Sequence, residues 1–168
     1  MKDSLPTYII RETRSEDVPI LLQLVKKLAE YEKLLPDVSA SEVLFEKNGF
    51  GEAPYFHSLL VENKEESGPR YLGFALYFFT FSTFLGKPTL YLEDLFVLPE
   101  YRGRGIGKDL LIQLARVAIE RDCGRMEWSV LNWNKPAIDF YLNLGAKPMD
   151  EWTVYRLTGS DLKTLALT

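Results

Sequence analysis

Apolar side chains recur at helical spacing in four stretches of the chain. Residues 16–33 predict a helix whose apolar face is formed by Val18, Leu21, Leu22, Val25, Leu28 and Ala29, with Ser15 as its N-cap. A shorter helix is expected in SASEVLFEKNGFG, begun by Ser39 or Ser41 and stopped at Gly49. Two further helices follow from DLLIQLARVAIER, which ends near Arg121, and from NKPAIDFYLNLG, which Gly145 closes.

Short apolar or alternating runs predict the strands. They are TYIIR (7–11), HSLLVEN (57–63), RYLGFALYFFTF (70–81), TLYLEDLFV (89–97), MEWSVL (126–131) and EWTVYRLTG (151–159). The polar turn KEESGP joins the second strand to the third, which predicts an antiparallel meander. Strand, helix and strand then alternate, and no repeat or linker interrupts the chain. The order predicts a single domain over residues 1–168, of mixed α/β class, with helices around a central sheet.

Net charge and cysteine content limit the kinds of partner and compartment that this protein is expected to have. The chain has 168 residues and a formal net charge of −4, whereas a nucleic-acid-binding protein needs a basic face. A single cysteine, Cys123, excludes an internal disulfide framework and fits a reducing compartment. The first residues lack the apolar core of a signal peptide, and no segment is long enough to span a bilayer. We therefore expect a cytoplasmic protein with no nucleic-acid or membrane partner. His57 and Cys123 are expected to be core residues, and no metal site is expected.

The stretch LPEYRGRGIGK (98–108) lies between a predicted strand and a predicted helix. It is not a P-loop, because Arg102 takes the place of the first glycine and Asp109 the place of the metal-binding hydroxyl. It also departs from the dinucleotide fingerprint, since its spacing is Gly-x-Gly-x-Gly and the next strand ends without an acid. Backbone N–H groups at the start of a helix bind a pyrophosphate well, and Arg102 and Arg104 add positive charge. The loop therefore predicts a pyrophosphate site.

The pattern Arg102-x-x-Gly105-x-Gly107 resembles the coenzyme A signature of the GNAT superfamily of N-acetyltransferases. LAEYEKL, NGFGEAPYFHSLLVE, FSTFLGK, YLEDLFVLPEYRGRGIG and VLNWNKPAIDFYLNLGA are together similar to its spermidine/spermine and thialysine acetyltransferase branch. The resemblance implies the GNAT acyltransferase fold, of class α/β (α+β), with a mixed, mostly antiparallel sheet flanked by helices. It also implies acetyl-CoA as donor and a homodimer. The implied cofactor-binding residues are Leu95, Phe96, Val97, Arg102, Gly103, Arg104, Gly105, Ile106, Gly107, Lys108, Asn134 and Pro136.

Acetyl transfer to an amine needs a route for the amine's proton, a donor to the carbonyl oxygen and an acid for the thiolate. Glu93 and Asp94 are adjacent carboxylates that a regular strand would direct to opposite faces. The resemblance implies that Glu93 draws off the proton through water and that a backbone N–H within residues 95–97 holds the oxygen. It implies that Tyr141 protonates the thiolate, although the pattern alone favours a core aromatic residue. Asn134 has two compatible explanations, as the N-cap of the following helix and as a contact to the pantetheine arm.

The acceptor is the least defined part of the prediction. By resemblance the acceptor-binding residues are Tyr31, Glu32, Glu93, Asp94, Phe84 and Thr153. The polyamine enzymes of the branch carry an acid and a tryptophan where this chain has Ser82 and Phe84, and again where it has Thr153 and Tyr155. We therefore expect a small cationic amine, either thialysine or another lysine-like amine or a diamine or polyamine, with the lysine-like acceptor used faster. The alternatives are a protein-lysine or antibiotic acetyltransferase and a non-catalytic acyl-CoA-binding sensor.

Overall fold

A computed structural model describes residues 7–168. The chain divides into two compact units, one that ends at Ser129 and one that begins at Val130, and each is described by itself. No helix within residues 7–168 is long and apolar enough to cross a membrane.

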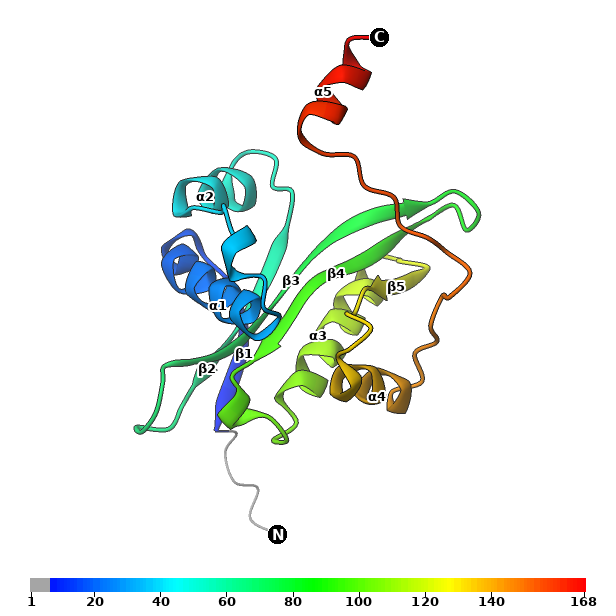
Figure 1. Ribbon diagram of the computed structural model, residues 1–168. Helices are drawn as coiled ribbons and strands as arrows, with labels where there is room; N and C mark the ends of the chain where they lie inside the picture. Colours follow the sequence, from blue (N-terminus) through cyan, green and yellow to red (C-terminus); the bar gives the residue numbers. More distant parts are fainter. Residues whose placement is uncertain (1–6) are drawn as a thin grey trace. The chain divides into compact units, whose positions relative to one another are not determined.

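The first unit is built on a five-stranded sheet whose strands follow one another in chain order (Figure 1). The first three pairings are antiparallel and the last is parallel. The parallel pairing requires a crossover, which the helix between the last two strands supplies. The strands are β1 (Tyr8–Glu12), β2 (His57–Asn63), β3 (Tyr71–Ser82), β4 (Lys87–Val97) and β5 (Arg125–Trp128). The prediction of a mixed, mostly antiparallel sheet is confirmed.

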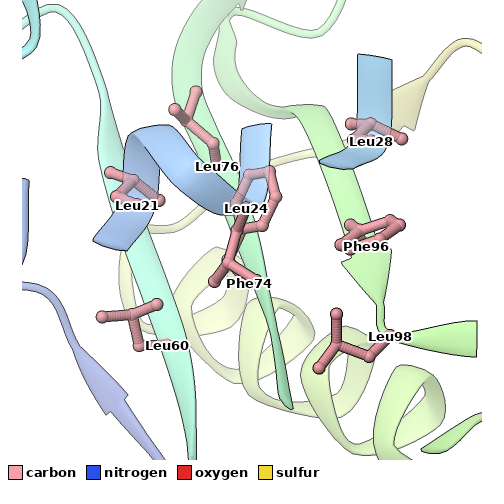
Figure 2. Close-up of a cluster of buried hydrophobic side chains, with 8 residues drawn as sticks. All are labelled: Leu21, Leu24, Leu28, Leu60, Phe74, Leu76, Phe96 and Leu98. Atoms are coloured by element: carbon pink, nitrogen blue, oxygen red, sulfur yellow. The ribbon is translucent and has the colours of Figure 1, made fainter. Parts of the chain in front are cut away.

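Helices cover both faces of this sheet, with α1 and α2 on one side and α3 on the other (Figure 1). The first unit contains η1 (Ser15–Asp17), α1 (Val18–Tyr31), η2 (Leu35–Asp37), α2 (Glu42–Phe50), η3 (Pro99–Tyr101) and α3 (Ile106–Glu120). Leu21, Leu24 and Leu28 lie one helical turn apart on α1 and face the sheet. They pack against Leu60, Phe74, Leu76, Phe96 and Leu98, and together these side chains form the core cluster in Figure 2.

The second unit contains α4 (Lys135–Asn143) and α5 (Gly159–Ala166). Asn134 is the N-cap of α4, with its side-chain oxygen accepting the N–H of Ala137 at 3.4 Å. Gly145 follows the helix at a φ of 88°, as predicted for a left-handed closing residue.

The predicted strand at residues 151–159 is wrong. Residues 152–158 are outside any helix or strand, although their apolar and polar residues alternate. A strand is stable only when its N–H and C=O groups pair with a neighbour, and residues 130–168 contain no second strand. Trp152, Val154 and Tyr155 are accordingly exposed.

Three predicted boundaries also change. Ser15 does not cap α1: it lies in η1, and its hydroxyl donates to Glu46 at 3.0 Å. Ser41, not Ser39, caps α2 by accepting the N–H of Leu44 at 3.3 Å, and the helix passes Gly49 before it ends at Phe50. The strand expected at 126–131 stops at Trp128.

A buried ion pair joins β1 to the start of α1. Arg11 donates to both carboxylate oxygens of Asp17, at 2.6 and 2.9 Å, and its Nε donates to Glu62 on β2 at 3.0 Å. Only 6% of the Asp17 side chain is exposed. The hydrogen bonds from Arg11 are the main reason that the pKa of Asp17 lies below its ordinary value. A carboxylate with a lowered pKa stabilises the fold above its unfolded-state pKa, and that stability disappears as pH falls through the lowered value.

We expect Asp17→Asn to lower the free energy of unfolding by about 2–3 kcal/mol at pH 7, because it leaves Arg11 without its bidentate partner. The difference from wild type should shrink as pH falls through the lowered pKa of Asp17. Urea titrations at several pH values measure both effects. Glu16→Gln is the matched control, since its ion pair with Arg14 is exposed and worth little. A loss in Asp17→Asn that is the same at every pH would contradict this explanation.

Candidate active site

A β-bulge places Glu93 outside the regular pairing of β4. Leu76 of β3 faces Asp94, but the next residue, Tyr77, faces Leu92, so Glu93 has no partner opposite it. A bulge interrupts the alternation of side chains and redirects the extra residue. The two-residue alternation assumed for Glu93 and Asp94 is therefore broken at this point, and the Glu93 side chain is exposed.

Three carboxylates that the sequence assigned to the site come together around this bulge. The pKa of Asp94 is raised to about 7, first by burial and then by the negative charges of Glu93 and Glu32. Glu32 immediately follows α1, and burial raises its pKa as well. The first unit thus gathers an acid cluster, defined here as Glu32, Glu93 and Asp94. Such a cluster attracts a cation and contains a carboxyl group able to exchange a proton near neutral pH.

Past the bulge, one edge of β4 has no neighbouring strand. β5 pairs with residues 89–92 only, whereas β3 continues along β4 to Val97. Within the described part of the first unit, no strand occupies the other edge at Leu95, Phe96 or Val97. Backbone groups on that edge are therefore available to a ligand, and the binding role of these residues stays a prediction.

The glycine loop has the backbone geometry of an anion site. Gly103 and Gly105 have φ values of 75° and 87°, and a Cβ added at either position would have no described atom within 4 Å apart from those of its chain neighbours. Gly105 occupies the N-cap of α3, and no side chain of residues 7–168 caps that helix. The N–H groups of the first helical turn have no partner within the helix, so they are suited to a pyrophosphate. Gly107 differs from the other two glycines in lying inside α3.

The two arginines of the loop are held by aromatic rings. The Arg104 guanidinium lies 4.6 Å from the centre of the Tyr101 ring. The Arg102 guanidinium lies 4.4 Å from the centre of the Tyr31 ring, and its Nε donates to the Val97 carbonyl at 3.0 Å. This contact joins two residues that the sequence assigned separately, one to cofactor and one to acceptor. Nothing in the sequence pattern indicated it.

Other predicted residues are not members of the acid cluster. Phe84 is in the turn before β4 and is 96% exposed, while Glu93 lies six residues into the strand, roughly 20 Å from its start. Asn134, Pro136, Tyr141 and Thr153 belong to the second unit. There, Tyr141 lies on α4 with its ring 5.3 Å from that of Phe140, and Thr153 is exposed. The roles assigned to these residues stay predictions.

His57 lines a cavity of about 170 Å³ in the first unit, between β1, β2, β3 and the end of α2. Its side chain is half-buried, and burial lowers its pKa. The rings of Tyr77 and Phe79 lie 5.5 and 5.8 Å from it. None of the predicted site residues lines this cavity. Within residues 7–168 no group of three or more His, Cys, Asp or Glu side chains is placed to hold a metal ion.

We expect Asp94→Asn to stabilise the protein more at pH 8 than at pH 5, because the loss begins above the unfolded-state pKa and is complete only above the folded value. An acid whose folded-state pKa is raised contributes stability below its unfolded pKa and loses it as pH rises through the folded value, here about 7. The amide removes that loss, and a gain of about 1 kcal/mol would raise Tm by about 2–4 °C. Thermal unfolding at the two pH values measures the difference. Glu120→Gln, on the exposed end of α3, should show none. An equal shift at pH 5 and pH 8 would exclude titration of Asp94 as the cause.

Comparison with known proteins identifies the family. A model of the acetyltransferase (GNAT) family matches residues 22–146. The thialysine N-epsilon-acetyltransferase of Bos taurus is 41% identical over 165 residues, which is 94% of this chain and 96% of the relative. The human spermidine/spermine N(1)-acetyltransferase-like protein 1 is 34% identical over 171 residues, 97% of this chain but 24% of its own length.

A solved structure has a similar fold over nearly the whole chain. An integron cassette protein from the mobile metagenome of V. cholerae has a TM-score of 0.80 at 29% identity, covering 97% of this chain and 99% of its own. The family match spans β4, the glycine loop and α3, where the acid cluster and the uncapped helix lie. The chain therefore belongs to the GNAT family of N-acetyltransferases, in the branch of the thialysine and spermidine/spermine enzymes.

Proposed function

We propose that this enzyme transfers the acetyl group of acetyl-CoA to the primary amine of a small, lysine-like cation. The observation that carries the proposal is the position of the acid cluster on β4, directly before the loop that leads to the uncapped start of α3. The carboxylates that attract a cation and the N–H groups that suit a pyrophosphate thus lie at opposite ends of one strand–loop–helix segment. When bound, acetyl-CoA supplies a thioester, which is reactive toward a neutral amine.

The residues of the loop suit the pyrophosphate of acetyl-CoA. Gly103 and Gly105 let the backbone approach closely, and Ile106, Gly107 and Lys108 contribute the first N–H groups of α3. Arg104 and Lys108 add positive charge near these donors. The open edge of β4 at Leu95, Phe96 and Val97 offers backbone groups to the pantetheine arm and to the acetyl oxygen.

The acid cluster suits the acceptor. An alkyl ammonium with a pKa near 10.4 arrives charged and must lose a proton before it reacts. Glu32 and Asp94 attract the cation, while Glu93, exposed at the bulge, can pass the proton to water. The raised pKa of Asp94 gives the cluster a second group able to accept a proton near neutral pH.

Three residues of the second unit have proposed roles of their own. We assign Tyr141 as the acid that protonates the departing thiolate, since a phenol hydroxyl can donate its proton to a thiolate. Asn134 and Pro136, at the start of α4, would contact the pantetheine arm. The family match crosses from the first unit into the second, which supports a single domain over residues 1–168. A homodimer and a cytoplasmic location are part of the same proposal.

A lysine-like acceptor is favoured over a polyamine for two reasons. The bovine thialysine enzyme is more similar to this chain than the human spermidine/spermine-like protein is. A polyamine also carries a second ammonium group, which would need an acid of its own. The turn between β3 and β4, residues 82–87, contains no acidic residue. Ser82 is buried there with its hydroxyl accepting the N–H of Leu85 at 3.3 Å, and Phe84 projects into solvent.

The test of acceptor and base is a rate comparison across pH. We expect wild type to acetylate thialysine faster than spermidine, measured as thiol release from acetyl-CoA. Glu93→Gln should lower kcat/KM about 10²-fold at neutral pH and recover partly as pH rises, because solvent then deprotonates the amine. Glu32→Gln is the matched control, since it should mainly raise the acceptor KM. A loss in Glu93→Gln that is independent of pH would make Glu93 a binding group only, and faster turnover of spermidine would refute the lysine-like acceptor.

Removing the hydroxyl of Tyr141 tests the proton donor. Tyr141→Phe keeps the ring and its packing against Phe140, so the fold should survive. We expect kcat to fall about 10²-fold or more with little change in the KM for acetyl-CoA. Tyr55→Phe, at an exposed tyrosine, is the control and should behave as wild type. A wild-type kcat in Tyr141→Phe would return this residue to a packing role.

A further inference from the structure

We propose that Arg102 is a positioning residue that couples the cofactor loop to the acceptor site through Tyr31. The inference rests on the proposed function for the identity of the two ligands. It changes the role expected of Arg102, which the sequence assigned to direct contact with the cofactor. The loop thereby gains a physical link to α1, an element far from it in the chain.

The Arg102 side chain leaves the loop and reaches back over the end of β4. Its Nε donates to the Val97 carbonyl at 3.0 Å, and its guanidinium carbon lies 4.4 Å from the centre of the Tyr31 ring and 5.8 Å from that of Phe96. A planar cation at such distances from a ring face is held electrostatically as well as by contact. Arg102 therefore touches the open end of β4 and the last residue of α1 at once.

Both of its partners are firmly placed. Phe96 is 3% exposed and belongs to the core cluster, and Tyr31 packs against the same cluster. Tyr31 directly precedes Glu32, a member of the acid cluster. A shift of the Arg102 side chain would therefore change the position of Glu32 through Tyr31 and that of the β4 edge through Val97. Arg104 makes no such link, because its guanidinium lies over the ring of Tyr101, which is only three residues earlier in the chain.

The two roles predict different responses to substitution. A direct phosphate contact depends on positive charge, which lysine retains. A positioning contact depends on the planar guanidinium and on a donor at Nε, and lysine supplies neither. Arg102→Lys separates the roles for that reason, and Tyr31→Leu removes the other side of the contact without altering the loop.

The experiment measures the Kd of acetyl-CoA by calorimetry, without turnover, and then the acceptor KM and kcat. We expect Arg102→Lys, Arg102→Met and Tyr31→Leu each to raise the acetyl-CoA Kd and the acceptor KM about 5- to 10-fold. The double variant Arg102→Met/Tyr31→Leu should lose no more than the larger single variant, because both changes remove one contact. Tyr31→Phe keeps the ring face and should retain the wild-type Kd. Arg104→Met is the matched control: it should raise the Kd but leave the acceptor KM unchanged.

Two results would overturn the proposal. One is a wild-type acetyl-CoA Kd in Tyr31→Leu, provided that thermal unfolding shows the variant to be folded. If it is not folded, Tyr31→Met takes its place, since it also removes the ring face but fills more of the same volume, and a wild-type Kd in that variant overturns the proposal. The other is a wild-type Kd and acceptor KM in Arg102→Lys, which would make Arg102 a charge contact to phosphate. Absence of acetylation with every amine would refute the proposed function, but the Kd values would still decide the role of Arg102.

Discussion

The unequal pairing of the two edges of β4 is the constraint on which the site depends. One edge is paired with β3 along its length, and this holds the strand in the sheet. The other edge is paired with β5 over four residue positions and is then free of strands within the described first unit. The bulge at Glu93 lies where that second pairing ends. The same short stretch therefore turns a carboxylate outward, leaves backbone groups unpaired and leads into the glycine loop. A longer β5 would occupy the edge that the proposed ligand needs.

Two carboxylates of the first unit have pKa values shifted in opposite directions, because their charged neighbours differ in sign. Asp17 is buried, but two hydrogen bonds from Arg11 stabilise its charge, and its pKa falls. Asp94 is also partly buried, but its charged neighbours are Glu93 and Glu32, and its pKa rises. The first arrangement stabilises the fold at neutral pH. The second destabilises it there, and such an arrangement is typical of a site kept for function.

The sequence predicted features that depend on neighbours along the chain. The amphipathic face of α1, the left-handed glycine after α4 and the loop before α3 all follow from local patterns, and all are present. It could not predict features that depend on register or on distant partners. The bulge at Glu93 exists only in relation to β3, and Arg102 meets Tyr31 only because α1 packs beside β4. Residues 151–158 fail as a strand for the same reason, since alternation creates a strand only where a pairing partner exists. The acid cluster was predicted in part. Its residues could be named from the sequence, but the raised pKa of Asp94 depends on burial and on the nearness of Glu32, which only the folded structure shows.

The order of the strands also sets the order in which the sheet can form. β2, β3 and β4 are joined by short turns, so their pairings close small loops at low entropic cost. β1 pairs with β2 only after α1 and α2 have been traversed, and Arg11 lies 51 residues from Glu62. Because contacts between distant residues form more slowly, we expect the meander to form first and the first strand to dock late. On that order, the ion pair of Arg11 with Glu62 is absent from the rate-limiting step of folding and acts chiefly to slow unfolding.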